Sequence, residues 1–247
     1  MSRQPISGNS SVRAQSEVVG VALLLGIAVL SLGALTLTIG VALEENAAAA
    51  DANAVATDLE QGIEPVTATG TRESSLSFTD GTLRTTERTV RVIEDDEVIS
   101  TWDVGAIVYE TDGHRVISLG GAVVESRGEY SRVHEGPPVA ASEGAFLVGV
   151  VEIDPVESVS HGGTGASTLT LRTTVSHDRT ELGDGEYAVA VETTTPDAWG
   201  REFERQGAST SVETFEGDDE PSVVGRFEGE RTGYVVIHDV ELEVFHD

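Results

Sequence analysis

The hydrophobic pattern of the chain begins with a long apolar run. From Val18 to Leu43 there are 26 residues without a charged side chain. A transmembrane helix needs about 20 apolar residues, whereas the apolar region of a cleaved secretory signal has roughly 7–15. The run is therefore long enough for a membrane-spanning helix and too long for an ordinary secretory signal.

A more polar helix is expected directly after this run. Residues 44–61 are rich in alanine and glutamate, and Gly62 and Pro65 are stop signals. The apolar run and this extension together predict one helix over residues 15–62. At 1.5 Å per residue, such a helix is roughly 70 Å long.

After Pro65 the pattern changes to a period of two, which is typical of β-strands. Asp-Gly pairs at residues 80–81, 112–113 and 184–185 lie between alternating apolar runs and predict hairpin turns. The C-terminal residues 234–245 alternate in the same way. We expect about ten short strands in one domain.

One helix is expected to interrupt these strands. Thr195 is its predicted N-cap, Pro196 its first residue and Gly207 its end. The fold class is therefore α+β: a long N-terminal hydrophobic helix, then a mainly antiparallel β-rich head that forms a sandwich or a rolled sheet.

Charge adds a further constraint. The chain has 43 acidic and 15 basic residues, a net charge of −28, no lysine and no cysteine, yet 39% of its residues are hydrophobic. A foldable domain this acidic suits high salt, because at about 1 M salt the Debye length falls to ~3 Å and self-repulsion is screened. The alternative is an acidic, solvated surface without a halophilic role. Nucleic acid is excluded as a partner, because phosphate binding needs a basic surface.

The residues before the apolar run carry a resemblance to a known family. The stretch VRAQSEVVG, residues 12–20, resembles the processing site of archaeal type IV pilins and archaellins, whose class III signal peptides precede an apolar stalk. The matching positions are Arg13 and Ala14 before the cut, and Gln15 and Ser16 after it. The resemblance, which is closest to haloarchaeal pilin-like proteins, implies that a prepilin peptidase removes a basic leader, residues 1–14, at the cytoplasmic face.

The stalk itself has two features of interest. Gly26, Gly33 and Gly40 are seven residues apart, so on a helix they form one narrow stripe of small residues. Such a stripe lets another helix approach closely, although glycine is also simply frequent in membrane helices. Glu17 is the only charge between Arg13 and Glu44, and either pairs with a neighbouring amine at the membrane edge or faces water.

The sequence contains no catalytic constellation. His161 and His177 are not at metal-binding spacing and are expected to be solvated, and no P-loop or G-x-S-x-G motif occurs. The acidic clusters at residues 94–97 and 217–221 lack the ligand spacing of known calcium loops and are expected to be solvated turns. We therefore expect neither enzymatic activity, nor a cofactor, nor a metal.

These observations favour a structural, pilin-like protein of the cell envelope. The expected organisation is a leader (1–14), a hydrophobic stalk or transmembrane helix with its extension (15–62) and an acidic, β-rich extracellular head (63–247). Arginines before the apolar run and glutamates after it place the N-terminus in the cytoplasm and the head outside. The expected partners are the membrane, the prepilin peptidase, and further copies or other pilin-like subunits in a surface filament. The alternative is a single-pass anchored extracellular binding domain that forms no filament.

Overall fold

The computed structural model describes residues 10–63, 68–155 and 160–246. Its first element, α1, is one uninterrupted helix, Ser10–Ile63, so the long N-terminal helix is confirmed. The chain divides into two compact units between Asn46 and Ala47. The last turns of α1 therefore belong to the same unit as the strands, although the sequence placed the boundary at residues 62/63.

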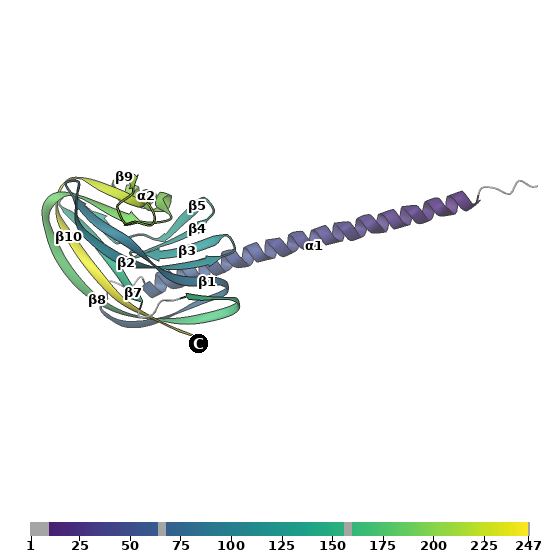
Figure 1. Cartoon of the computed structure of the whole chain (residues 1–247), viewed down its shortest axis with the longest axis horizontal. Coiled ribbons are helices and arrows are strands. Elements are labelled where there is room, and N and C mark those ends of the chain that lie inside the picture. The colour runs from purple at the N-terminus through teal and green to yellow at the C-terminus, as the bar shows by residue number, and fades with distance from the viewer. Residues whose placement is uncertain (1–9, 64–67, 156–159, 247) are drawn as a thin grey trace, which may run out of the picture. The chain divides into compact units, whose positions relative to one another are not determined.

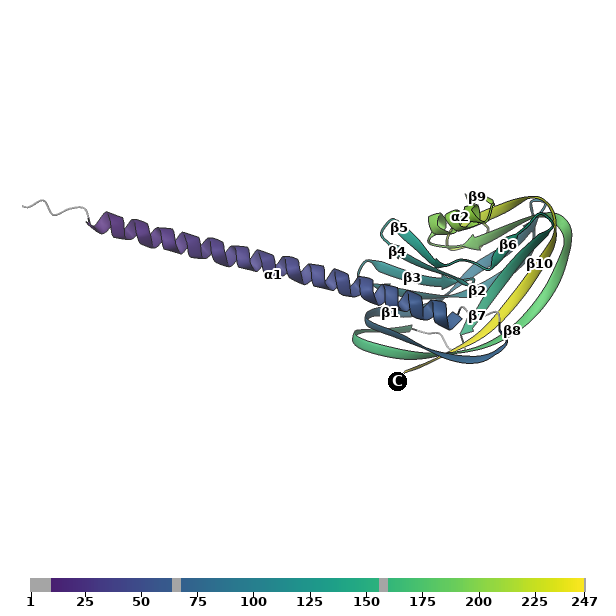
Figure 2. The same ribbon diagram turned by 180° about the vertical axis from the view of Figure 1, so that it is seen from behind.

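Ten strands and one further helix follow α1 in the part of the chain that the structure describes (Figures 1 and 2). In chain order they are β1 Gly70–Glu94, β2 Glu97–Thr111, β3 His114–Leu119, β4 Ala122–Arg127, β5 Tyr130–Glu135, β6 Val139–Ala141, β7 Ala145–Pro155, β8 Ser160–Glu192, α2 Pro196–Arg205, β9 Ser209–Glu213 and β10 Ser222–His246.

All ten strands belong to a single curled sheet, in the order β5-β4-β3-β2-β1-β8-β10-β7-β6, with β9 also paired to β10 (Figure 1). Most neighbouring strands are antiparallel, and β7 pairs with β10 in parallel. The α+β class is therefore confirmed. Within the described residues, the strands form one curled sheet rather than a two-sheet sandwich.

Of the three expected hairpins, one is confirmed. Gly113 has a positive φ of 71° and lies in the turn between β2 and β3, where Thr111 faces His114. The other two expectations are wrong: β1 continues through Asp80–Gly81 and β8 continues through Asp184–Gly185.

The reason is that the residues after each pair form backbone hydrogen bonds with another strand and do not fold back on the residues before the pair. The residues around Asp184 pair with β10 instead, and the register shifts there, so glycine marks an irregularity in a long strand. At Gly81, φ is +132° and an added Cβ would lie 2.6 Å from the carbonyl oxygen of Glu110. Glycine is needed at that point for close approach of β2, not for a turn.

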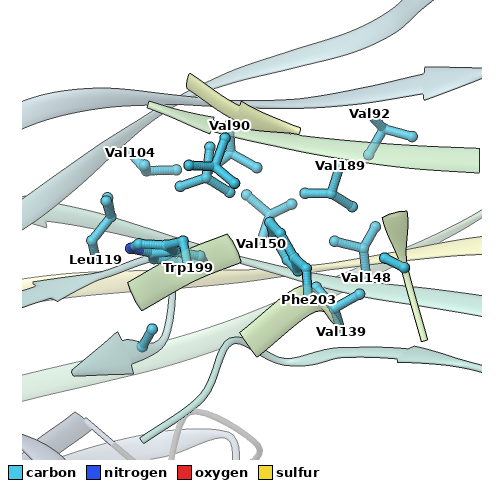
Figure 3. Close-up of a cluster of buried hydrophobic side chains, with 14 of the residues drawn as sticks. Val90, Val92, Val104, Leu119, Val139, Val148, Val150, Val189, Trp199 and Phe203 are labelled. Carbon is cyan, nitrogen blue, oxygen red and sulfur yellow. The ribbon is translucent and has the colours of Figure 1, made fainter. Parts of the chain in front are cut away.

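One face of the sheet is covered by α2. Trp199 and Phe203 of this helix are 3% and 0% exposed and pack among valines of β1, β2, β7 and β8 (Figure 3). The expected helix is thus confirmed, with Pro196 at its start and Gly207 just after its end at a φ of 88°. Thr195 holds the N-cap position, but its side chain makes no capping hydrogen bond.

A second cluster of buried apolar side chains contains the last turns of α1. Ala52, Val55, Ala56 and Leu59 are all 0% exposed and pack with side chains of β1, β2, β3, β7, β8 and β10. Their spacing of three, one and three residues places them on one helical face. Along β2, Ala106 and Val108 belong to the first cluster, whereas Ile107 and Tyr109 belong to the second. Since neighbouring side chains of a strand point to opposite faces, the two clusters lie on opposite faces of the sheet.

Carboxylates of α1 also hydrogen-bond to the edge of β1. Before Thr82, β1 pairs with β8 but not with β2. The backbone N–H groups of Thr79 and Asp80 donate to Asp51, and that of Ser77 donates to Asp58, at 3.0–3.2 Å. The helix therefore satisfies backbone groups that would otherwise be left without a strand partner.

Candidate membrane segment and polar clusters of the head

The first unit presents a helix whose apolar side chains are exposed. Eleven large aliphatic side chains from Leu23 to Leu43 are 51–75% exposed. The helical stretch Leu23–Gly62 contains an apolar segment with a mean hydropathy of 2.2, and no part of that segment is buried within the described protein. Burying one such side chain is worth about 1.5–3 kcal/mol. By length and composition, the segment is able to span a membrane.

The glycine stripe lies within this exposed segment. A Cβ added at Gly26, Gly33 or Gly40 would meet no atom within 4 Å, so no contact within the described chain requires glycine there. One polar side chain nearby is satisfied by the helix itself: Thr36 donates to the carbonyl of Leu32 at 2.9 Å, as expected for a polar group on a membrane helix. The role of the stripe in packing stays a prediction.

The expected processing site is helical, but its side chains are not described. Arg13, Ala14, Gln15, Ser16 and Glu17 lie in the first turns of α1. Residues 1–9 of the expected leader lie outside the described residues. Cleavage after Ala14 and the partner of Glu17 therefore stay predictions.

One of the two acidic clusters of the head has a structural role that the sequence did not indicate. Asp218, expected in a solvated turn, has a side-chain exposure of 0% and forms a bidentate ion pair with Arg91, whose side chain is 9% exposed. It also accepts a hydrogen bond from Ser222 at 2.8 Å. Asp95 and Asp96 have φ angles of 48° and 68° and form the tight turn between β1 and β2. The expectation of a merely solvated cluster is thus wrong for Asp218, because its turn is tied to β1.

The four histidines whose side chains the structure describes lie in strands and face side chains of neighbouring strands. His177 of β8 and His238 of β10 face each other in register, with their Nδ1 atoms 3.0 Å apart. A second group lies on β3, β4 and β5, where the carboxylate of Glu125 is 2.9 Å from Nε2 of His134 and 3.5 Å from Nδ1 of His114. The expectation for His177 was therefore wrong, since β8 carries it into the sheet; the side chain of His161 is not described.

An acidic groove of about 760 Å³ lies between β1, β2, β7 and the turn before β10. Glu152 and Asp239 are register partners in the groove, and Asp103 lies nearby. Burial, and then the charges of Asp239 and Asp103, raise the pKa of Glu152 above its usual value. The groove is therefore a place of electrostatic repulsion within the fold.

Two buried tyrosines are held in their neutral form. Burial is the largest cause that raises the pKa of Tyr109 and of Tyr187 to about 12. The Tyr109 hydroxyl donates to the carbonyl of Asp80, and the Tyr187 hydroxyl is 3.0 Å from both the Glu94 carboxylate and the Gly183 carbonyl. At neutral pH both act as hydrogen-bond donors that hold strands together.

Among the described residues, no group of three or more His, Asp or Glu side chains is arranged to hold a metal ion. A model of a family of unknown function, DUF7289, matches residues 13–243. No curated protein and no solved structure matches the chain. The family match covers the apolar segment together with the head. The chain therefore belongs to the DUF7289 family, a family of unknown function.

Proposed function

We propose that this protein is a structural, pilin-like subunit of the cell envelope. In this proposal it is exported with a class III signal peptide and is cut between Ala14 and Gln15. The helix that remains keeps it in the membrane or in a surface filament, with the acidic head outside the cell. Arg3 and Arg13 before the apolar run, and Glu44 and Glu45 after it, support this orientation.

The observation that carries the proposal is the continuity of α1. An exposed apolar helix runs without a break into turns that are built into the core of the head, where Val55 and Leu59 are 0% exposed. Cleavage after the apolar run would separate that run from the turns in the head core. A cut between Ala14 and Gln15 removes only the first residues of α1, Ser10–Ala14, and leaves the apolar run joined to the head, as the pilin resemblance of residues 12–20 implies.

The extent of the family match adds support. The match begins at residue 13, at the last two residues of the expected leader, and includes the whole apolar segment. A segment that belongs to the same family unit as the head is better explained as part of the working protein than as a disposable signal. Glycines 26, 33 and 40 offer a surface on which a second helix backbone is able to approach.

The experiment that tests the proposal is the mass of the mature N-terminus from native membranes. We expect the protein to begin at Gln15, and expect Arg13→Gln to leave the leader attached. Arg3→Gln is the matched control, because it removes the same charge from the leader away from the cut and should leave cleavage unchanged. A mature protein that begins at Met1 or Ser2 would instead favour the anchored binding domain, and one that begins after Leu43 would exclude both.

Assembly needs its own measurement. Gly26→Leu combined with Gly33→Leu should keep membrane insertion but abolish crosslinked oligomers or filaments. The control is Ala28→Leu combined with Ala42→Leu, which adds similar bulk on the opposite helical face, since each residue turns the helix by about 100°. If the glycine variant assembles as the parent does, or if the parent forms no oligomer at all, the filament part of the proposal is refuted.

A further inference from the structure

A small cavity in the head gathers an unusual share of the positive charge. Arg84 and Arg88 of β1 and Arg115 of β3 line it, together with Thr86, Thr193 and Thr194; we call it the arginine pocket. Three of the fifteen basic residues of the chain therefore meet at one point of a molecule whose net charge is −28. Arg84, Thr86 and Arg88 alternate along β1, so they share one face of the sheet.

The acidic side chains nearby do not cancel this charge. Glu110 is 2.6 Å from Arg115 and 3.7 Å from Arg84, so one carboxylate serves two guanidinium groups. Glu192 is 3.9 Å from Arg88, but its oxygens already accept hydrogen bonds from the backbone N–H groups of Thr89, Asp219 and Glu220 at 3.0–3.1 Å. Three cations thus face two carboxylates, one of which is already engaged by the backbone.

One residue that lines the pocket also carries a hydroxyl group without a partner. Oγ1 of Thr194 is buried and has no hydrogen-bond partner among the described residues. Leaving a buried polar group unpaired costs about 1–3 kcal/mol. Thr86 Oγ1 accepts from Arg88 at 3.4 Å, so its own proton remains available to donate. The side chain of Arg88 is 13% exposed, which limits the water that screens its charge.

Size decides which anion fits. The cavity measures about 20 Å³, and a cavity of roughly 10–15 Å³ or more, measured in the same way, is what one water molecule needs. Phosphate, sulfate and a side-chain carboxylate each contain several non-hydrogen atoms and are too large for this cavity, so a single-atom anion fits best. The floor of the arginine pocket is apolar and is formed by side chains of β2 and β3. A charge there therefore interacts more strongly with the arginines than it would in water.

We propose that the arginine pocket binds one small inorganic anion, with chloride as the physiological ion. Arg88 and the Thr194 hydroxyl donate to it inside, and Arg84 and Arg115, whose side chains are 43% and 41% exposed, lie at the mouth. Hydrogen bonds to an ion are stronger than those between neutral groups. The bound anion ties β1 and β3 to the segment that leads into α2.

The test uses the full chain in detergent micelles and chloride as the probe. Exchange with a bound site broadens the chloride NMR line, and bromide should compete for it. We expect Arg88→Gln to abolish the excess line width and Thr194→Val to weaken apparent affinity about tenfold, as for one lost hydrogen bond to a charged group. Arg172→Gln is the control: Arg172 lies outside the pocket, its side chain is 41% exposed and is paired with Glu73 and Glu243, and the variant should bind chloride as the parent does.

Thermal unfolding at constant sodium concentration gives a second readout. Replacing gluconate with chloride should raise the melting temperature of the parent but not that of Thr194→Val. In gluconate, Thr194→Val should be at least as stable as the parent, because an unpaired hydroxyl has become a methyl group. If the parent shows no excess chloride line width, the pocket holds only water and the proposal is overturned. Equal binding by the parent, Arg88→Gln and Thr194→Val overturns it as well.

Discussion

Truncating Leu59 tests whether the last turns of α1 belong to the core of the head. Leu59 is 0% exposed and packs in the apolar cluster between α1 and the sheet. Leu59→Ala removes three carbon atoms from this cluster and leaves a cavity. Leu43→Ala is the matched control: it is the same substitution in the same helix, at a position that is 65% exposed.

The expected cost follows from the burial. Leu→Ala substitutions in well-packed cores destabilise proteins by about 2–5 kcal/mol. For a unit the size of Ala47–Asp247, each kcal/mol lowers the melting temperature by roughly 2–4 °C. Leu59→Ala should therefore lower the melting temperature by about 4–20 °C. Leu43→Ala should change the melting temperature by no more than about 0.5 kcal/mol of destabilisation would, as expected for an exposed substitution.

Tryptophan fluorescence is the appropriate measurement for this comparison. Both tryptophans of the chain, Trp102 and Trp199, lie in the head, and Trp199 is 3% exposed. Far-ultraviolet circular dichroism would be dominated by the apolar helix, which detergent keeps folded. If Leu59→Ala melts with the parent, or if Leu43→Ala is lowered to the same extent, the end of α1 is not part of the head core.

Three further predictions concern the charges of the head. Arg91→Met should destabilise the head by about 3–5 kcal/mol in chemical denaturation, because it leaves the buried Asp218 carboxylate unpaired. Adding Asp218→Leu should recover much of that loss, and a double variant that is less stable than Arg91→Met contradicts this. Glu152→Gln should raise the melting temperature near neutral pH but not well below 4.5, because the pKa of Glu152 is raised in the fold and its stabilising contribution is lost as pH rises through that raised pKa; an equal change of melting temperature at both pH values would contradict this. Dialysis from molar salt into dilute buffer should unfold the head, since the repulsion among the acidic residues of a chain with a net charge of −28 is then unscreened; unchanged near-ultraviolet circular dichroism would refute the halophilic interpretation.

The elements that the sequence predicted correctly depend on local signals. A 26-residue apolar run specifies a helix whatever surrounds it, and the Pro196 and Gly207 signals bound α2 within two residues. The turn at Gly113 likewise needs only its two flanking strands. In each case the preference of a few neighbouring residues agrees with the final structure.

The two hairpin predictions were wrong because the actual strand pairing involves residues that are distant in sequence, and local signals do not contain it. β8 pairs with both β1 and β10 along its length, so the strand continues through Asp184–Gly185 despite their turn preference. Conversely, the acidic cluster at residues 94–97 is expected to form a turn, and Asp95 and Asp96 do form one. Both residues have positive φ, a conformation that aspartate tolerates better than most residues, so a signal for this turn was present in the sequence.

The polar clusters could not be predicted, because they are set by the register between distant strands. His177 and His238 are 61 residues apart in sequence, and Arg91 and Asp218 are 127 apart. The arginine pocket joins β1, β3 and the residues before α2. Alternation along β1 does place Arg84 and Arg88 on one face, but only the sheet order brings Arg115 beside them.

The junction between the apolar segment and the head bears on the choice between a subunit and a tethered binding domain. Glu44, Glu45 and Asn46 separate the last exposed leucine of the apolar run from the first residue of the head unit, Ala47. A domain tethered for reach needs a flexible linker, typically rich in glycine, serine or proline. Here the three connecting residues are helical and contain none of these. A helix without a flexible linker suits a subunit whose helix is its means of assembly. The chemistry of the junction thus favours the structural proposal over the tethered alternative.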